Sequence, residues 1–205
     1  TPTRELAQQV TAATTQFDKY LRRTICGSIV GGMPYPRQLE MLAKMPDILV
    51  ATPGRLLDHM NSGRIDLSEL SMLVFDEADR MLDMGFSDDI DAIVGQTPST
   101  RQTLMFSATL DGRTGALASN MLRDPVRVAI AQQQMDYKRI EQRVHFVDDT
   151  AHKERLLDHL LTNEDLQQMI IFTATKAEAD YLADDLCEKG HSASALHGDM
   201  KQTMR

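Results

Sequence analysis

The sequence predicts an α/β fold with parallel sheets. Short apolar runs recur along the chain, and many are followed by longer segments whose apolar residues return every three or four positions. The short runs have the length of buried strands, and the longer segments have the period of helices that bury one face. Several of the runs end in glycine or in a polar pair, which are turn signals. Strands that alternate with helices in this way form parallel βα units.

Length and composition fit one or two domains of a globular protein. The chain has 205 residues, 42% hydrophobic and 25% charged, and no apolar stretch approaches the roughly 18 residues of a membrane span. Cys26 and Cys187 lie far apart without CxxC spacing, so we expect neither a zinc site nor a disulfide framework. A reduced, cytoplasmic location fits this cysteine usage.

The net charge of −8 disfavours a broad basic surface for nucleic acid. Any RNA contact would therefore depend on backbone N–H groups, helix N-termini and a few arginines.

The chain opens in a segment that is already patterned as a helix. Apolar residues such as Leu6 and Val10 recur at helical spacing within residues 1–23. Thr24–Val30 then predicts a strand, and Gly31-Gly32 ends it with two residues that let a backbone or ligand approach closely. Because the first residue is threonine and not methionine, we expect a fragment or a processed chain.

A second βα unit follows the first. Pro36–Lys44 predicts a short helix, and Asp47–Ala51 predicts the next strand. The sequence Thr52-Pro53-Gly54-Arg55 then leads into a helix over Leu56–Met60, because threonine at the N-cap followed by proline is a helix-start signal.

The apolar run Met72–Phe75 ends in two carboxylates, Asp76 and Glu77. This run predicts a fully buried strand, and open α/β sheets bind ligands at the carboxyl ends of their strands. One acid there can hold Mg²⁺ while its neighbour positions or deprotonates an attacking water. Alternatively, Asp76 caps a helix that begins near Ala78, and Glu77 is first-turn charge. The stretch alone leaves both interpretations open.

The remaining segments repeat the plan. Gln102–Phe106 predicts a strand that ends in Ser107-Ala108-Thr109, and Val126–Ile130 predicts the last strand of the first half. The polar stretch Ala131–Arg139 lacks periodicity and predicts a linker. The second half is expected to contain the strand Gln142–Val147, the helix His152–Leu161, the strand Met169–Thr173, the helix Ala177–Lys189 and the strand Ala193–Leu196.

With these stretches identified, the chain resembles the DEAD-box family of ATP-dependent RNA helicases. The matching segments occur in the family order and cover nearly the whole chain: PTRELA, the glycine pair, TPGR, DEAD, SAT, IIFxxTK and HGDMxQxxR. The resemblance implies two RecA-like parallel-sheet domains at residues 1–130 and 140–205, both incomplete, joined by a flexible linker at 131–139. It also implies ATP and Mg²⁺ as cofactors and RNA as partner, with domain closure prying a short duplex apart.

The resemblance further implies roles for five residues around the nucleotide. Asp76 would hold the Mg²⁺ of MgATP, and Glu77 would orient or activate the hydrolytic water. Asp79 would bond with the hydroxyls of Ser107 and Thr109 and so link the nucleotide site to the RNA side. A simple capping turn after the strand is the alternative explanation for Ser107 and Thr109.

A second group matches positions that grip the RNA sugar-phosphate backbone without reading bases. Its members are Pro2, Thr3, Arg4, Gly32, Thr52, Gly54 and Arg55 in the first domain and Thr175, Gly198 and Asp199 in the second. Gln202 and Arg205 match the last visible motif. For an arginine considered alone, such as Arg4 or Arg55, a surface ion pair is the alternative.

The sequence contains no phosphate loop of the form G-x-x-x-x-G-K-[ST], which in the family precedes PTRELA. Without it the β- and γ-phosphates have no cradle, so we expect this chain alone to be inactive as an ATPase. A missing strand would also leave one flank of Met72–Phe75 without a hydrogen-bond partner. The predicted function is an ATP-dependent RNA helicase, and the alternative is a non-catalytic RNA-binding clamp or scaffold derived from a helicase core.

Overall fold

A computed structural model describes residues 1–20, 24–110, 112–130, 141–162, 168–200 and 204. Contacts between residues divide the chain into two units, Thr1–Val126 and Arg127–Arg205. The predicted linker at 131–139, together with Gln202 and Arg205, lies outside the described residues. The domain boundaries expected at 130 and 140 therefore stay predictions. No helix in the described ranges is long and apolar enough to cross a membrane.

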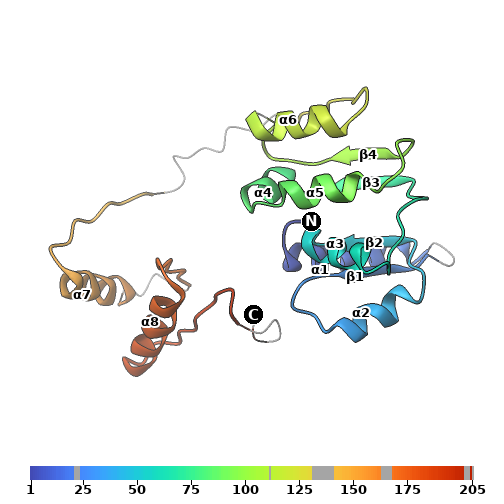
Figure 1. Cartoon of the computed structure of the whole chain (residues 1–205). Coiled ribbons are helices and arrows are strands. Elements are labelled where there is room, and N and C mark those ends of the chain that lie inside the picture. The colour runs from blue at the N-terminus through green and yellow to red at the C-terminus, as the bar shows by residue number, and fades with distance from the viewer. Residues whose placement is uncertain (21–23, 111, 131–140, 163–167, 201–203, 205) are drawn as a thin grey trace. The chain divides into compact units, whose positions relative to one another are not determined.

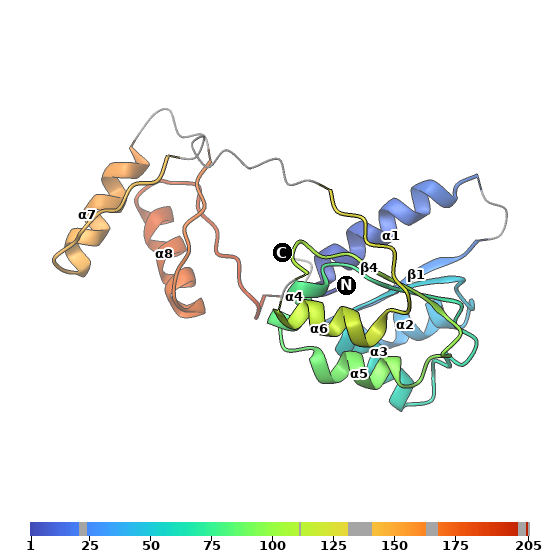
Figure 2. The same cartoon turned by 90° about the horizontal axis from the view of Figure 1, so that it is seen from above.

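The first sheet of unit 1 pairs β1 (Cys26–Ile29) with β2 (Ile48–Ala51) in parallel, so that Ile29 lies opposite Ala51. Three helices accompany it: α1 (Arg4–Asp18), α2 (Tyr35–Leu42) and α3 (Pro53–Asn61). Figure 2 shows α1 on one side of these strands and α2 and α3 on the other. Ala7, Val30 and Val50 form the buried core between α1 and the sheet.

The second sheet pairs β3 (Met72–Phe75) with β4 (Gln102–Met105), again in parallel. The helices α4 (Ala78–Asp83), α5 (Ser87–Val94) and α6 (Gly112–Met121) lie beside these strands (Figure 1). Its larger core consists of Phe75, Ala78, Met81, Leu82, Ile90, Leu117 and Met121. The α/β class with parallel strands is thus confirmed, and the two connections βαβ follow the sequence pattern.

The prediction that Met72–Phe75 is fully buried is wrong. Phe75 is buried, but Met72 and Val74 are 50% and 47% exposed. Among the described residues β3 pairs with β4 alone, so its other edge is open, as the missing partner strand led us to expect. Side chains on a strand stay accessible where no neighbouring strand or helix covers them.

Unit 2 contains α7 (Thr150–Leu161) and α8 (Lys176–Glu188), whose N-caps Asp149 and Thr175 each accept a backbone N–H. Both helices match their predictions within two residues. In its described part, Leu186 is the one buried hydrophobic side chain. Unit 2 therefore owes its order more to helix capping and ion pairs than to an apolar core.

Four predicted strands do not form: no strand includes residues of Val126–Ile130, Gln142–Val147, Met169–Thr173 or Ala193–Leu196. Their apolar side chains remain in solvent, and Phe146 and Phe172 are each 92% exposed. A strand forms only when a neighbour accepts and donates its backbone hydrogen bonds. The apolar pattern of these segments does not supply that neighbour.

Candidate functional site

The turn between β3 and α4 carries the predicted catalytic acids. Asp76 follows the last residue of the strand, and Glu77 occupies the N-cap position of α4 in the left-handed region, with φ 55° and ψ 54°. The next N–H, that of Ala78, donates to the carbonyl of Phe106 at 3.0 Å and ties this turn to the end of β4. A non-glycine residue held at positive φ costs about 1 kcal/mol, and such strain clusters at functional sites.

The alternative interpretation, in which Asp76 caps the helix, is wrong. The N-cap residue is Glu77, and no side-chain hydrogen bond caps α4. Glu77 forms a long ion pair with Arg80 at 3.5 Å, and its side chain is 40% exposed. Neither carboxylate is used up by helix capping.

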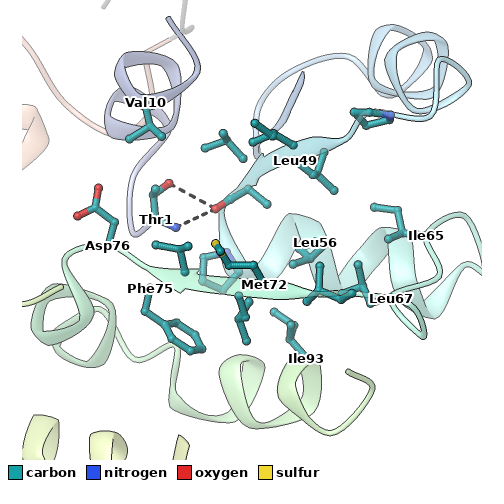
Figure 3. Close-up of a pocket in the computed structure, with 18 of the residues that line it drawn as sticks. Thr1, Val10, Leu49, Leu56, Ile65, Leu67, Met72, Phe75, Asp76 and Ile93 are labelled. Carbon is teal, nitrogen blue, oxygen red and sulfur yellow. Dashed lines mark hydrogen bonds between the residues drawn. The ribbon is translucent and has the colours of Figure 1, made fainter. Parts of the chain in front are cut away.

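A cavity of about 1030 Å³ lies between the open edges of β2 and β3. Its walls are mainly apolar, and Thr1 and Asp76 lie at one end of it (Figure 3). The α-amino group and hydroxyl of Thr1 both donate to the carbonyl of Ala51, at 3.0 and 3.3 Å. Burial lowers the pKa of this amino group, although Asp76 and Glu77 attract its charge and oppose the shift. The start of α1 is thereby fastened to the start of α3.

Asp79 joins the acidic turn to the predicted SAT motif. Its carboxylate accepts from the backbone N–H of Thr109 at 3.2 Å and from the Thr109 hydroxyl at 3.3 Å. The Ser107 hydroxyl donates to the carbonyl of Thr109 at 2.6 Å, as in a local turn. Burial acts to raise the pKa of Asp79, but hydrogen bonds from Ser107, Arg80 and Thr109 outweigh it and lower that pKa.

Arg4 lies against the glycine turn that follows β1. A Cβ added to Gly32 would come within 2.2 Å of Nη1 of Arg4, and Gly32 has φ +74°. Only glycine permits this contact, because any Cβ would displace the guanidinium and also strain the backbone. Thr3, the N-cap of α1, uses its hydroxyl to accept the N–H of Leu6 at 3.2 Å. No ion pair between described residues includes Arg4, so its surface ion-pair alternative is not observed.

At the start of α3, Thr52 is buried at the N-cap, and its hydroxyl forms no capping bond. Gly54 lies in the first turn, where a Cβ would rest 3.5 Å from the carboxylate of Asp89. Arg55 does form an ion pair, with Asp58 at 3.7 Å, but its side chain is only 15% exposed. It is therefore packed into the fold rather than lying on the surface.

These residues of unit 1 converge because β1 and β2 are parallel. The glycine turn after β1, the N-terminus of α3 after β2 and the N-terminus of α1 all lie at the carboxyl ends of the two strands. Helix N-termini offer free N–H groups to anions, and Arg4 adds a full positive charge. The arrangement can bind phosphates without contacting bases.

In unit 2, Thr175 is the N-cap of α8 and accepts the N–H of Glu178 at 3.1 Å. The neighbouring Lys176 donates to Asp199 at 2.7 Å, which lowers the pKa of that carboxyl. This bond brings the Gly198-Asp199 turn to the start of α8. The three predicted residues of unit 2 thus lie near one another.

Sequence reasoning missed Tyr35, Gln38 and His59, which pack around Arg55. No sequence period relates α2 to α3, so this contact could not be read from spacing. The adjacency of Tyr35 to the glycine turn was the one available signal.

The acids fit a magnesium ion that is held jointly with a nucleotide. Mg²⁺ usually keeps several waters and takes one or two protein carboxylates plus substrate phosphates. Asp76 and Glu77 supply carboxylates that capping does not consume. Across the described residues no group of three or more His, Cys, Asp or Glu side chains could hold a metal by itself.

Comparison with known proteins decides the family. The model of the DEAD/DEAH box helicase family matches residues 1–117, more than half of the chain. The chain belongs to the DEAD/DEAH box helicase family. The matched helicase segment contains the β3–α4 turn, the glycine turn and the start of α3.

Relatives of this helicase chain include the DEAD-box ATP-dependent RNA helicase RhpA of Helicobacter pylori, which is 40% identical over 206 residues. The ATP-dependent RNA helicase DbpA of Escherichia coli is 41% identical, and the RNA helicase CrhR of Synechocystis is 40% identical. Each match covers the whole chain. The chain spans 41%, 44% and 42% of the length of these relatives, respectively.

Proposed function

We propose that this chain is part of an ATP-dependent RNA helicase that couples MgATP binding and hydrolysis to local separation of RNA strands. One observation carries the proposal: the acids after β3 are free of helix capping, and Asp79 connects their turn to the residues after β4. The names of the relatives, which are RNA helicases, support the substrate.

In this mechanism the carboxylate of Asp76 would hold Mg²⁺, and Glu77 would orient the attacking water and accept its proton. When bound, the metal would supply charge neutralisation for the phosphoryl group being transferred. The left-handed backbone at Glu77 would set its orientation, because the turn fixes the direction in which the side chain leaves the backbone.

Asp79 couples the two sites. Its carboxylate accepts both hydrogen bonds from Thr109, and hydrogen bonds of this kind lower its pKa. Any shift of the β3–α4 turn therefore pulls on the segment Ser107–Thr109. Such a link lets a nucleotide bias an RNA-competent state, provided that the nucleotide binds that state more tightly.

The RNA backbone would lie along the carboxyl ends of β1 and β2. We assign Pro2, Thr3, Arg4, Gly32, Thr52, Gly54 and Arg55 to the part of this track in unit 1, and Thr175, Gly198 and Asp199 to unit 2. The contacts of the track are with phosphate and sugar, and their small number fits a net charge of −8.

A second candidate is a non-catalytic RNA clamp. It would use the backbone-binding groups at the carboxyl ends of β1 and β2 without turning over ATP. Because the 205 residues contain no G-x-x-x-x-G-K-[ST] loop, we propose that this chain alone has negligible ATPase activity. RNA-stimulated phosphate release by the purified chain, at the rate of a complete helicase, would contradict this.

A chimera tests the helicase function. In Escherichia coli DbpA, the aligned segment would be replaced by residues 1–205 of this chain, so that the host supplies the rest. We expect RNA-stimulated phosphate release from the chimera, and Glu77→Gln should lower kcat by about 100-fold or more while RNA binding persists. Glu69→Gln, at an exposed position of unit 1, is the matched control.

Two results would count against the helicase. If the Glu77→Gln chimera turns over ATP at the rate of the unmodified chimera, the catalytic role proposed for Glu77 is wrong. A folded chimera that binds RNA but releases no phosphate would favour the clamp.

A further inference from the structure

The ring of Tyr35 is surrounded by three cationic or aromatic groups. The guanidinium carbons of Arg55 and Arg64 lie 4.8 and 5.0 Å from its centroid, and the ring of His59 lies 4.6 Å away, tilted by 32°. Arginine over an aromatic face within about 6 Å is attracted by the ring quadrupole. The cluster therefore joins α2, which carries Tyr35, to both ends of α3.

Local geometry at the end of α3 places Arg64. Gly63 has φ +64°, and its N–H donates to the carbonyl of Met60 at 2.9 Å. The N–H of Arg64 donates to the carbonyl of His59, also at 2.9 Å. These two bonds form a Schellman motif, which turns the chain back over the last turn of the helix and toward Tyr35.

His59 supports the ring from within the fold. Its side chain is fully buried, and neither ring nitrogen has a hydrogen-bond partner among the described residues. Burial lowers its pKa, and the nearby charges of Arg55 and Arg64 lower it further. A neutral imidazole packs against Tyr35 without repelling either guanidinium. The Tyr35 ring is thereby held in place where both guanidinium groups lie against it.

Arg55 contacts both the Tyr35 ring and the glycine turn. Its Nη1 donates to the carbonyl of Met33 at 3.5 Å, and the buried Gln38 donates to the same carbonyl at 2.9 Å. The bond from Arg55 is long, and its ion pair with Asp58 is 3.7 Å, so neither contact alone fixes the guanidinium. The stacking on Tyr35 supplies the missing constraint.

Met33 directly follows Gly32, against which the guanidinium of Arg4 packs. Arg4 thus covers the turn at Gly32, and Arg55 holds the next residue by its carbonyl. The two arginines differ in consequence: Arg4 has no ion pair among the described residues, whereas Arg55 is largely buried and directs its donors at protein acceptors.

We propose that Tyr35 is a positioning residue for RNA binding, and that Arg55 acts on RNA through the glycine turn rather than by a phosphate contact of its own. Tyr35 orients Arg55, Arg55 shares the Met33 carbonyl with the buried Gln38, and the turn then presents Gly32 and Arg4 to the RNA backbone. This inference rests on the proposed RNA track, changes the role of Arg55 in it from direct contact to support, and adds a residue that the motif positions do not include.

The test uses the 205-residue chain and a fluorescein-labelled 20-nucleotide oligouridylate, with affinity measured by anisotropy over a series of KCl concentrations. Tyr35→Leu removes the π face but keeps apolar bulk, and Tyr35→Phe keeps the face. We expect Tyr35→Leu to weaken binding about fivefold and Tyr35→Phe to restore it. Tyr20→Leu, at an exposed tyrosine that also has a cation near its ring, is the matched control and should bind like the unchanged chain.

The salt dependence separates positioning from direct contact. Each lost phosphate contact on a single strand reduces the slope of log K against log salt by about 0.7. Arg4→Ala should reduce the slope by this amount, whereas Tyr35→Leu and Arg55→Ala should weaken binding and leave the slope unchanged. In the Arg55→Ala background, Tyr35→Leu should have no further effect.

Different outcomes reject different claims. Unchanged affinity and slope in Arg4→Ala would reject the proposed RNA track itself. If Arg4→Ala behaves as expected, a reduced slope in Arg55→Ala would reject the positioning role. The positioning role would also be rejected if folded Tyr35→Leu bound RNA with full affinity. The same holds if Tyr35→Phe lost as much RNA affinity as Tyr35→Leu. Circular dichroism of each variant establishes whether it is folded. If Tyr35→Leu does not fold, the comparison of Arg55→Ala with Arg4→Ala still tests the positioning role.

Discussion

One carboxylate oxygen of Asp79 accepts hydrogen bonds from both the backbone N–H and the hydroxyl of Thr109, at 3.2 and 3.3 Å. The two residues are 30 positions apart. Asp79 lies on α4 after β3, and Thr109 lies beyond β4, so the bonds join the segments that leave two neighbouring strands. This contact therefore connects the helix that follows the acidic turn to the SAT segment.

Replacement of Asp79 tests this link through acid stability. The pKa of Asp79 is lowered in the folded chain, so its contribution is present above the unfolded pKa and is lost as pH falls through the lower folded value. Asp79→Asn should reduce the free energy of unfolding by about 1 kcal/mol at pH 7, because the group is partly exposed. Urea unfolding at pH 7 and pH 3 measures this, and the difference between variant and parent should shrink at the lower pH. An equal difference at both pH values would contradict the ionic link.

The left-handed backbone at Glu77 should lower the stability of the fold. Its φ of 55° suits glycine, so Glu77→Gly should raise the free energy of unfolding relative to Glu77→Ala by about 1 kcal/mol. Both variants lack the carboxylate, so only backbone strain differs between them. Thermal denaturation of the pair gives the comparison. Equal midpoints would indicate that the turn relaxes when the carboxylate is removed.

The contact between Gly32 and Arg4 predicts a specific effect of alanine. Gly32→Ala places a Cβ 2.2 Å from Nη1 of Arg4, in addition to the strain of positive φ. The matched control is Gly85→Ala, where φ is +81° and nothing lies within 4 Å of the added Cβ. Both should lose about 1 kcal/mol of stability from strain, but only Gly32→Ala should also weaken binding of oligouridylate. Equal RNA affinity in the two variants would contradict a role for this contact.

Burial of His59 predicts a loss of stability on mild acidification. Its folded pKa lies below its unfolded value of about 6.5, so its stabilising effect is complete above that value and falls as pH decreases toward the folded pKa. The contribution to the slope is at most about 1.4 kcal/mol per pH unit. His59→Leu should remove this component between pH 7.5 and 5.5, whereas His159→Leu, at an exposed position, should retain it. Chemical denaturation at several pH values makes the comparison.

Lys189 should stabilise unit 2 by bridging its helices. Its ammonium lies 2.9 Å from Asp185 of α8 and 3.1 Å from Asp158 of α7, and the hydrogen bonds that it donates to these acids raise the pKa of Lys189 to about 12. This contribution is complete below about pH 10.4, the unfolded value, and is lost as pH rises through 12. Lys189→Met should lower the melting temperature at low salt, with a smaller difference at 1 M NaCl. Lys44→Met, in unit 1, is the control and should show no such salt dependence.

The first four strands could be located from sequence because their apolar runs find parallel partners in the fold. β3 matches its predicted bounds, and β1, β2 and β4 lie within theirs. The four later runs have the same kind of pattern and form no strands, as Phe172 illustrates. Periodicity describes which side chains favour burial, but a strand also needs an adjacent backbone, and that depends on residues distant in sequence.

Some features of the candidate site were predicted from sequence, and others were not. The resemblance predicted Asp76, Glu77 and bonds from the hydroxyls of Ser107 and Thr109 to Asp79. The bond from Thr109 is present, whereas the Ser107 hydroxyl donates to the carbonyl of Thr109. The catalytic and RNA-binding roles of these residues stay predictions. Nothing in the sequence indicated the left-handed backbone at Glu77 or the contact of Arg55 with Tyr35.

By itself the sequence determined the family, the α/β class, the order of the motifs and the position of the acids at the end of a strand. These features depend on short runs of residues that are adjacent in the sequence. The tertiary structure alone decided that neither acid caps α4, that Gly32 makes room for Arg4, and that Tyr35 holds Arg55 beside the glycine turn. Each of these depends on atoms brought together from separate elements, and packing and hydrogen-bond geometry over such distances leave no period in the sequence.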